Sequence, residues 1–381
     1  MLKKIFFSIC LLLNTLLFAQ DTDIVTGRFA TIYSDILKQN RVIQIGLPLS
    51  YNTSQKKYPV LYILDGSTSF EFAVSITKFL SHSGRIPEMI VVGITNVDRT
   101  FDLTPSPLEF RKSGNGKNFM KFLTGEVRSF IDNNYRTMDY NIFSGHSLGG
   151  NMTIYSLFEN PDNFDAYIAV SPYLASGDYF TLNLVKEKIA DLDLEQKYLY
   201  VTIGNEPPYF EFMKEFSELI KNSDKDDFTY IYENMNNEDH SSIRLKAVYN
   251  ALENLFKEWI LSTTIIEKGI GAIEDHFEAF EEKYGYEYKI PEHLLNNLGY
   301  QMMVKNKTDI AIGIFYKNTE LYPNSANAFH SLGDAYKKNK NFREAKKSYE
   351  EAVKLAEENN HPRKELFKKG LKEIQKYIFN N

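Results

Sequence analysis

Short apolar runs alternate with longer amphipathic stretches over roughly the first two thirds of the chain. A parallel sheet with helices on both faces buries its strands, so each strand is a nearly continuous apolar run and each helix an apolar stripe. Seven runs have the strand pattern, at residues 42–47, 59–64, 89–94, 140–143, 166–170, 198–203 and 228–232. Five stretches have the helical pattern, at residues 70–80, 119–131, 151–158, 210–220 and 243–259. The alternation predicts one α/β domain over residues 21–262, with a mostly parallel sheet covered by helices on both faces.

The pattern changes after residue 262, where helical stretches are separated by Pro, Gly and Asn. Large and small residues recur there 34 positions apart: Leu295, Leu298, Gly299, Ala311 and Phe315 match Phe329, Leu332, Gly333, Ala345 and Tyr349. This period resembles the tetratricopeptide repeat, in which each unit is a pair of helices.

The repeats divide the rest of the chain. We expect a helical linker at 263–290 and an all-helical repeat module at 291–381, with units at 291–324 and 325–359 and a capping helix at 362–378. Two units are fewer than such arrays usually need for stability. The module is therefore expected to pack against residues 265–286 or against the α/β domain.

The first residues have the pattern of a secretory signal peptide at 1–19. Lys3 and Lys4 precede an apolar run, and Ala19 ends it with a small residue. The run is shorter than the roughly 20 residues that a membrane-spanning helix needs. We therefore expect a periplasmic or secreted protein with no permanent membrane span. Cys10, the only cysteine, lies in this segment, so the exported chain would have no disulfide.

Composition excludes several other classes of function. The formal net charge is −6, and no basic stripe is present that could neutralise a nucleic-acid backbone. No Cys or His pair has metal-ligand spacing, and there is no glycine-rich phosphate loop or dinucleotide fingerprint. We expect no nucleic-acid partner, no metal and no cofactor.

The candidate chemistry begins with Gly145 to Gly149, which read G-x-S-x-G around Ser147. A strand-like run precedes the motif and a helical stretch follows it, which is the order of a nucleophile elbow in the α/β-hydrolase fold. A serine hydroxyl needs a general base to attack at neutral pH. His240 follows the last strand-like run, where such enzymes carry their histidine. The sequence predicts Ser147 as nucleophile and His240 as base.

A carboxylate between these two positions should orient the histidine. Glu206 follows the strand-like run 198–203 and is our prediction. Glu211, Glu238 and Asp239 are alternatives, as is a Ser/His dyad without an acid.

Two backbone amides should stabilise the oxyanion formed during acyl transfer. One is expected from Leu148, directly after the nucleophile. The other is expected from Gly66 or Ser67, after the strand-like run 59–64, because small residues let the backbone approach a substrate.

Four segments carry a resemblance to a known family: Y-P-V-L-Y-I-L-D-G at 58–66, N-V-D-R-T-F-D-L-T-P at 96–105, G-H-S-L-G-G at 145–150 and D-H-S-S at 239–242. Residues 58–255 resemble the esterase family that holds esterase D, enterochelin-type siderophore esterases and feruloyl esterases. The resemblance implies an α/β-hydrolase fold and a serine carboxylic-ester hydrolase. It suggests that Arg99 and Asp102 shape the substrate cleft, although an internal Arg99–Asp102 ion pair fits equally well. One departure is Pro207 and Pro208, next to Glu206, where many relatives carry an Asp.

The expected reaction is two-step acyl transfer to water through an acyl-enzyme on Ser147. A siderophore lactone, a feruloylated sugar and a short acyl ester are all open as substrates. Transfer to another hydroxyl group, and an inactive scaffold that uses its repeats, are the alternatives. The repeats are expected to bind a protein or peptide partner or to act as a packing appendage.

Overall fold

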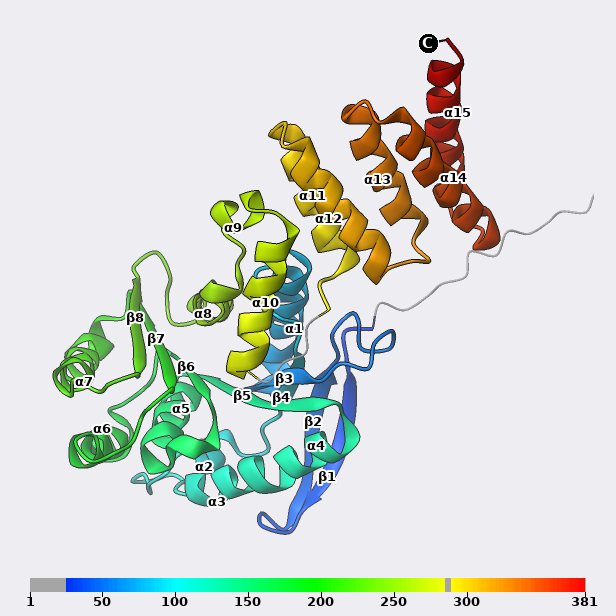
Figure 1. The fold of residues 1–381 in the computed structure, drawn as a ribbon. Helices are drawn as coiled ribbons and strands as arrows, with labels where there is room; N and C mark the ends of the chain where they lie inside the picture. Colours follow the sequence, from blue (N-terminus) through cyan, green and yellow to red (C-terminus); the bar gives the residue numbers. More distant parts are fainter. Residues whose placement is uncertain (1–24, 285–288, 381) are drawn as a thin grey trace, which may run out of the picture.

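The computed structural model describes residues 25–284 and 289–380 (Figure 1). The predicted signal peptide at 1–19 lies outside the described residues. An eight-stranded sheet has the order β1-β2-β4-β3-β5-β6-β7-β8, with β2 antiparallel to both of its neighbours and all other neighbouring pairs parallel. The strands are β1 (Arg28–Ser34), β2 (Gln39–Gly46), β3 (Tyr58–Ile63), β4 (Ile90–Ile94), β5 (Thr137–His146), β6 (Ala166–Val170), β7 (Tyr198–Gly204) and β8 (Thr229–Met235).

The predicted fold class is confirmed, and the seven predicted strands correspond to β2 through β8. Strand β1 was not predicted from the pattern. It lies at the edge of the sheet and buries only Ser34 fully, so it has no continuous apolar run.

Helices cover both faces of the sheet (Figure 1). Helices α1 (Gly66–His82) and α8 (Ile243–Leu255) pack on one face. The other face is covered by α3 (Gly116–Lys121), a π-helical turn (Phe122–Val127), α4 (Arg128–Asn134), α5 (Leu148–Glu159), α6 (Ser176–Lys188) and α7 (Phe210–Asn222). Successive side chains of β3 point to opposite faces of the sheet. Leu61 and Ile63 pack in the apolar core under α1 and α8, and Val60 and Tyr62 pack in the core on the other face.

Two helices of this domain were not predicted. Helix α2 (Arg99–Leu103) is a single short turn and lies within the N-V-D-R-T-F-D-L-T-P segment. Helix α6 begins with three left-handed residues, Gly177, Asp178 and Tyr179, which interrupt the apolar spacing.

Beyond residue 262, every regular element in the part of the chain that the structure describes is a helix. These helices are α9 (Thr263–Glu267), α10 (Ile270–Tyr284), α11 (Glu292–Val304), α12 (Thr308–Leu321), α13 (Ala326–Lys338), α14 (Phe342–Glu358) and α15 (Lys364–Asn380). Helices α11 to α14 form two equivalent pairs. A Cβ built at Gly299 would lie 2.5 Å from the Phe315 ring, and one built at Gly333 would lie 2.7 Å from the Tyr349 ring. The 34-residue spacing therefore reflects one packing arrangement used twice.

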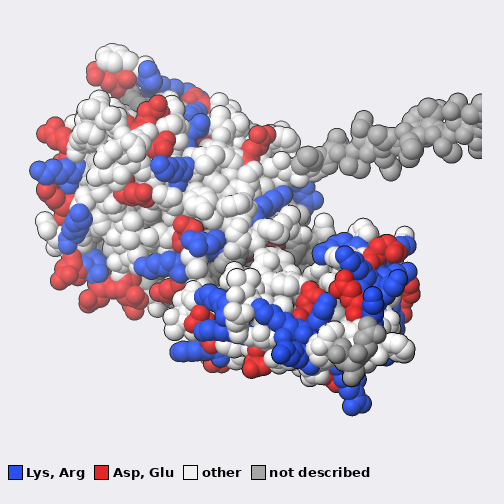
Figure 2. Space-filling model, turned by 90° about the horizontal axis from the view of Figure 1, so that it is seen from above, with Lys and Arg blue, Asp and Glu red and all other residues white. Residues whose placement is uncertain are grey.

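The repeats continue the core of the α/β domain. Ile273 and Phe277 of α10 belong to the same buried cluster as α1 and α8, and so do Leu295 and Leu298 of α11. The module thus packs against α10, one of the two supports expected for it, and extends away from the sheet (Figure 1). Acidic and basic side chains are interspersed over the face seen in Figure 2. Within the described residues, no helix is both long and apolar enough to cross a bilayer.

Candidate active site

Ser147 occupies a sharp turn between β5 and α5. Its backbone has φ 60° and ψ −117°, a left-handed conformation that is rare for a residue with a side chain. Its amide donates to the Val170 carbonyl at 2.9 Å, which ties the turn to β6. A Cβ built at Gly145 would lie only 2.2 Å from the Gly149 carbonyl oxygen, so a side chain at Gly145 would not fit. This strand, turn and helix hold Ser147 at the carboxyl edge of the sheet.

Glu206 and His240 meet at the same edge. Glu206 follows β7, His240 lies between β8 and α8, and Glu206 Oε2 is 2.5 Å from His240 Nδ1. Glu206 Oε1 accepts from the Ser171 hydroxyl at 2.6 Å and from the Gly204 amide at 3.0 Å. Burial alone would raise the pKa of Glu206, but the hydrogen bonds from His240, Ser171 and Gly204 outweigh it and lower the pKa. The carboxylate is therefore ionised and can orient the imidazole through Nδ1.

The alternative acids have other partners. Asp239 accepts from the amides of Ser241 and Ser242 at 2.8 Å, and Glu238 pairs with Lys246 at 3.1 Å. These contacts shape the turn that carries His240. Glu211 is exposed in the first turn of α7.

A second histidine, His146, lies beside the candidate base. Its ring centroid is 4.5 Å from that of His240. Burial lowers the pKa of His146 to about 4, and the positive charge that His240 can carry acts in the same direction. His146 is therefore neutral at neutral pH.

The predicted oxyanion amides lie in the first turns of two helices. Gly66 and Ser67 begin α1 and Leu148 begins α5, so their N–H groups have no acceptor within their own helix. Both helices start at the same edge because β3 and β5 are parallel neighbours. A Cβ built at Gly149 would lie 3.5 Å from the carboxylate of Asp65, so the two turns are in contact.

Arg99 joins these two turns. Its guanidinium makes a bidentate pair with Asp65, with Nε to Oδ1 at 2.7 Å and Nη2 to Oδ2 at 2.8 Å. Nη2 also donates to the carbonyl of His146 at 3.1 Å. Asp102, in contrast, is fully buried and forms an ion pair with Arg41 at 2.8 Å. The predicted role of Asp102 in the substrate cleft is wrong, because Asp102 lies in the core. The alternative Arg99–Asp102 pair is also wrong, because Asp102 pairs with Arg41.

Sequence reasoning assigned no role beside the catalytic residues to two residues at this edge. Ser171, left-handed at φ 41°, holds Glu206 from the end of β6. Its signal was a serine directly after the predicted strand 166–170. The Tyr209 ring lies 5.4 Å from the His240 ring, and the Ser147 side chain is near enough to lower the pKa of the Tyr209 phenol. Its signal was its position three residues after Glu206.

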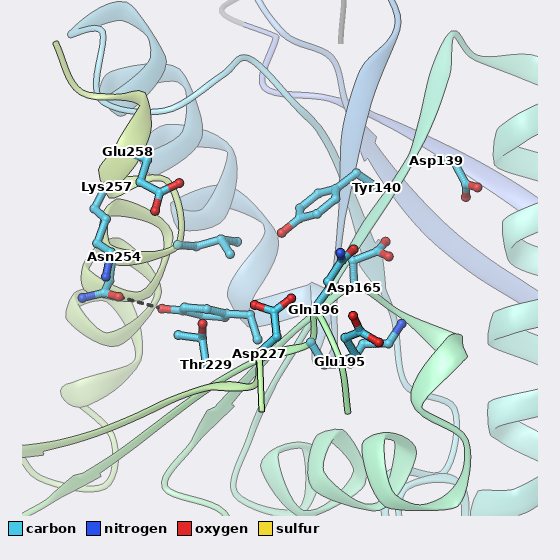
Figure 3. A pocket seen from close by; sticks show the side chains of 13 residues that line it. Asp139, Tyr140, Asp165, Glu195, Gln196, Asp227, Thr229, Asn254, Lys257 and Glu258 are labelled. Carbon is cyan, nitrogen blue, oxygen red and sulfur yellow. Dashed lines mark hydrogen bonds between the residues drawn. The ribbon is translucent and has the colours of Figure 1, made fainter. Parts of the chain in front are cut away.

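A polar hollow of about 660 Å³ lies at the opposite edge of the sheet (Figure 3). Its lining includes Asp165, Lys197 and Thr229, which lie at or just before the amino ends of β6, β7 and β8. Among the described residues, no group of three or more His, Cys, Asp or Glu side chains is placed to hold a metal ion. The elbow and the Glu206–His240 pair place the candidate chemistry at the other edge.

Comparison with known proteins agrees with this geometry. The family model described as "Putative esterase" matches residues 34–247, and the tetratricopeptide-repeat model matches residues 326–359. The siderophore triacetylfusarinine C esterase of Aspergillus fumigatus is 28% identical over 150 residues, which cover 34% of this chain and 50% of that protein. The ferri-bacillibactin esterase BesA of Bacillus subtilis is 30% identical over 141 residues, 30% of this chain and 47% of that protein. The chain thus spans about half the length of these two relatives.

Among solved structures, the IroE-like serine hydrolase from Shewanella oneidensis is similar with a TM-score of 0.66. It is 24% identical, and the match covers 77% of this chain and 99% of that one. The likeness shows a shared α/β-hydrolase fold.

Proposed function

The chain belongs to the "Putative esterase" family and is by class a carboxylic-ester hydrolase, and from this premise we propose that it works through Ser147, His240 and Glu206. The observation that carries the proposal is the Glu206–His240 pair at 2.5 Å, on the sheet edge that also holds the strained turn of Ser147.

In the first step, Ser147 Oγ attacks the ester carbonyl while His240 Nε2 takes the serine proton. The imidazolium that forms is stabilised by ionised Glu206 at Nδ1. The tetrahedral intermediate then expels the alcohol, which receives the proton from His240, and Ser147 is left acylated. Water repeats the sequence and releases the acid. The oxyanion formed in both steps is stabilised by the amides of Leu148 and of Gly66 or Ser67.

For the substrate, we propose an ester or lactone of the siderophore type. Support comes from the two relatives named as siderophore esterases. We further propose that the protein is exported, on the pattern of residues 1–19, and that the repeats bind a protein or peptide partner. The match of 326–359 to the tetratricopeptide repeat supports that last proposal.

The first experiment is hydrolysis of p-nitrophenyl esters from acetate to octanoate. Ser147→Ala and His240→Ala are expected to lose on the order of 10³-fold or more in kcat, because each removes a group that acts in the transition state. Ser75→Ala is a matched control, because Ser75 is exposed on α1 and bonds only its own helix. Wild type no faster than Ser147→Ala on every ester would overturn the assignment.

A second experiment compares a cyclic siderophore tri-ester, a feruloylated sugar and p-nitrophenyl acetate as substrates of the same preparation. The proposal predicts the highest kcat/KM for the tri-ester. Higher values for the feruloylated sugar or the simple acetate would assign the protein to one of those substrates. Mass analysis with added alcohols separates hydrolysis from transfer to another hydroxyl.

A further inference from the structure

Tyr209 lies beside two of the proposed catalytic residues. Its ring centroid lies 5.4 Å from that of His240, with 47° between the ring planes. The Ser147 side chain is near enough to lower the pKa of the Tyr209 phenol. Nothing in the proposed mechanism uses this residue.

The backbone holds Tyr209 in place. It ends a 3-10 turn, Pro207–Tyr209, and its amide donates to the Glu206 carbonyl at 2.9 Å. The two prolines restrict the backbone of the turn. The ring also packs against Phe212 at 5.1 Å and Tyr173 at 5.5 Å. The Tyr209 ring is therefore held in place beside His240 before a substrate arrives.

Tyr209 is also in the right protonation state to donate. Burial raises the pKa of its phenol, and the Ser147 side chain only partly offsets this effect. The hydroxyl is therefore neutral throughout the range in which His240 would act as a base, and it carries a proton that it can share but does not give up.

The direction of the hydroxyl follows from the rest of the site. The proposed oxyanion amides belong to Leu148 and to Gly66 or Ser67, at the starts of α5 and α1. The leaving oxygen must approach His240 instead, because His240 returns the proton to it. The Tyr209 ring lies beside the His240 ring, so Tyr209 is on the side of Ser147 from which the leaving oxygen approaches His240.

We propose that the Tyr209 hydroxyl donates a hydrogen bond to the leaving alcohol oxygen of the substrate, an inference that rests on the proposed roles of Ser147 and His240. As the bond between the carbonyl carbon and the alkoxy oxygen breaks, its electron pair goes to that oxygen. His240 Nε2 supplies the proton that completes the alcohol, and Tyr209 keeps its own. In the second step the attacking water occupies the place of the alcohol and meets the same donor.

The test is a leaving-group series measured as kcat/KM, which reports acylation, for wild type and Tyr209→Phe. Acetates of p-nitrophenol, phenol and ethanol share one acyl group and differ in how much charge the leaving oxygen must bear. For ethyl acetate the variant is expected to lose on the order of tenfold, the value of one hydrogen bond to a charged atom. For p-nitrophenyl acetate the loss should be small, because that oxygen leaves without help.

The control is Tyr155→Phe, which removes another phenol hydroxyl, on α5, and should show no dependence on the leaving group. Tyr209→Leu measures the part played by the ring, and thermal melting checks that each variant is folded. An equal loss on all three esters, or no loss, would overturn the role of Tyr209 while leaving the esterase assignment intact. Wild type no faster than Ser147→Ala would instead overturn the proposed function.

Discussion

Left-handed backbone occurs in both the α/β domain and the repeat module, but in different patterns. In the α/β domain, Asp65, Ser147 and Ser171 have φ of 55°, 60° and 41°, and they lie within two residues of the ends of β3, β5 and β6. In the module, Asn306 and Lys340 have φ of 58° and 59° and are 34 residues apart, at the turns after α11 and α13. The two module residues lie at matching turns of the repeat, whereas these three residues of the α/β domain lie together at the sheet edge that holds the candidate catalytic groups.

The two regions also differ in how far their charged side chains are exposed to solvent. Arg41 and Asp102 form an ion pair in which each side chain is 1% exposed, and Glu206 is 6% exposed. A typical pair of the module, Lys337 with Glu373, has 40% and 49% of its side chains exposed. Removal of a charged partner should therefore matter in the α/β domain far more than in the repeats.

The largest effect is expected from Glu206→Gln. The amide keeps the shape of the side chain but favours the wrong imidazole tautomer, so kcat should fall by on the order of 10³- to 10⁴-fold. The measurement is kcat on p-nitrophenyl acetate. Glu211→Gln, one turn into α7, is the matched control. A loss of less than tenfold would favour the Ser/His dyad.

The same variant changes the dependence of stability on pH. The pKa of Glu206 is lower in the folded protein than its ordinary value of 4.5, so its contribution to stability is complete above 4.5. That contribution is lost as the pH falls through the lower, folded-state pKa. Urea midpoints from pH 7 downward should therefore fall more for wild type than for Glu206→Gln. Parallel curves would show that folding does not lower the pKa of Glu206.

The next largest effect is expected on the free energy of unfolding, in the variant Asp102→Ala. Asp102→Ala leaves Arg41 buried without its partner, and such losses cost about 3–5 kcal/mol. Urea unfolding should show this loss, and kcat should be retained wherever the variant is folded, because Asp102 is buried in the core. The double variant Arg41→Met with Asp102→Leu should recover most of the stability. If it is as unstable as the single variant, the charge is not the cause.

A smaller loss, confined to activity, is expected from Arg99→Ala. The variant releases the turn of Asp65 from the turn of Ser147, and a misplacement of about 1 Å can cost roughly 100-fold in rate. We expect kcat to fall by on the order of 10- to 100-fold while KM stays nearly constant. Arg99→Lys should recover only part, because an ammonium cannot make the bidentate pair. Arg85→Ala, which breaks an ion pair between the turn after α1 and Glu253 of α8, is the control.

This experiment also decides between two interpretations of Arg99. The family resemblance suggests a residue that shapes the substrate cleft, and the structure shows contacts to Asp65 and His146. A rise in KM with kcat unchanged would restore the role in substrate binding.

The sequence allowed most of the fold to be predicted, because each buried strand and each helix has its own local pattern. Strand β1 and helix α6 were missed since an exposed edge strand and a left-handed start leave no such pattern. The repeat could be recognised in the sequence because Gly299 and Gly333 each pack against a large aromatic ring that leaves no space for a side chain.

The site residues also fall into those that could be predicted from the sequence and those that could not. Ser147 and His240 were named from a local motif and from their order along the chain. No role beside these residues could be assigned to Ser171 or Tyr209, because their contacts depend on how the loops after β6 and β7 meet. The partner of Arg99 was misjudged for a related reason. Asp102 is nearer in sequence, but folding brings Asp65 to the guanidinium and buries Asp102 beside Arg41.

In the module, volume rather than charge should decide stability. A Cβ at Gly333 would press on the Tyr349 ring, so Gly333→Ala should cost about 1–3 kcal/mol. At Gly313 of α12 the nearest atom, in Ile270, is 3.8 Å from a built Cβ. Gly313→Ala should therefore stabilise the helix, by up to about 1 kcal/mol. Chemical unfolding measures both, and kcat should stay unchanged. Effects of the same sign would contradict the packing argument.

The smallest effect tests what fastens the module to the rest of the chain. Lys317 of α12 pairs with Glu274 of α10 at 2.6 Å, with 27% and 40% of the side chains exposed. The hydrogen bond to Glu274 raises the pKa of Lys317, so the pair stabilises the protein below the ordinary pKa of 10.5 and loses that effect as the pH rises through the folded-state value. Because water and salt screen a half-exposed pair, Lys317→Gln should cost no more than about 1 kcal/mol and less in high salt.

Lys354→Gln removes a pair within α14 alone and serves as the control. If Lys317→Gln has the larger effect, and salt removes the difference, the pair adds a small increment to docking that the shared apolar core of α10 and α11 already provides. A cost of several kcal/mol that persists in high salt would mean that electrostatics fasten the repeats. That result would contradict the expectation that charged pairs matter far more in the α/β domain than in the repeats.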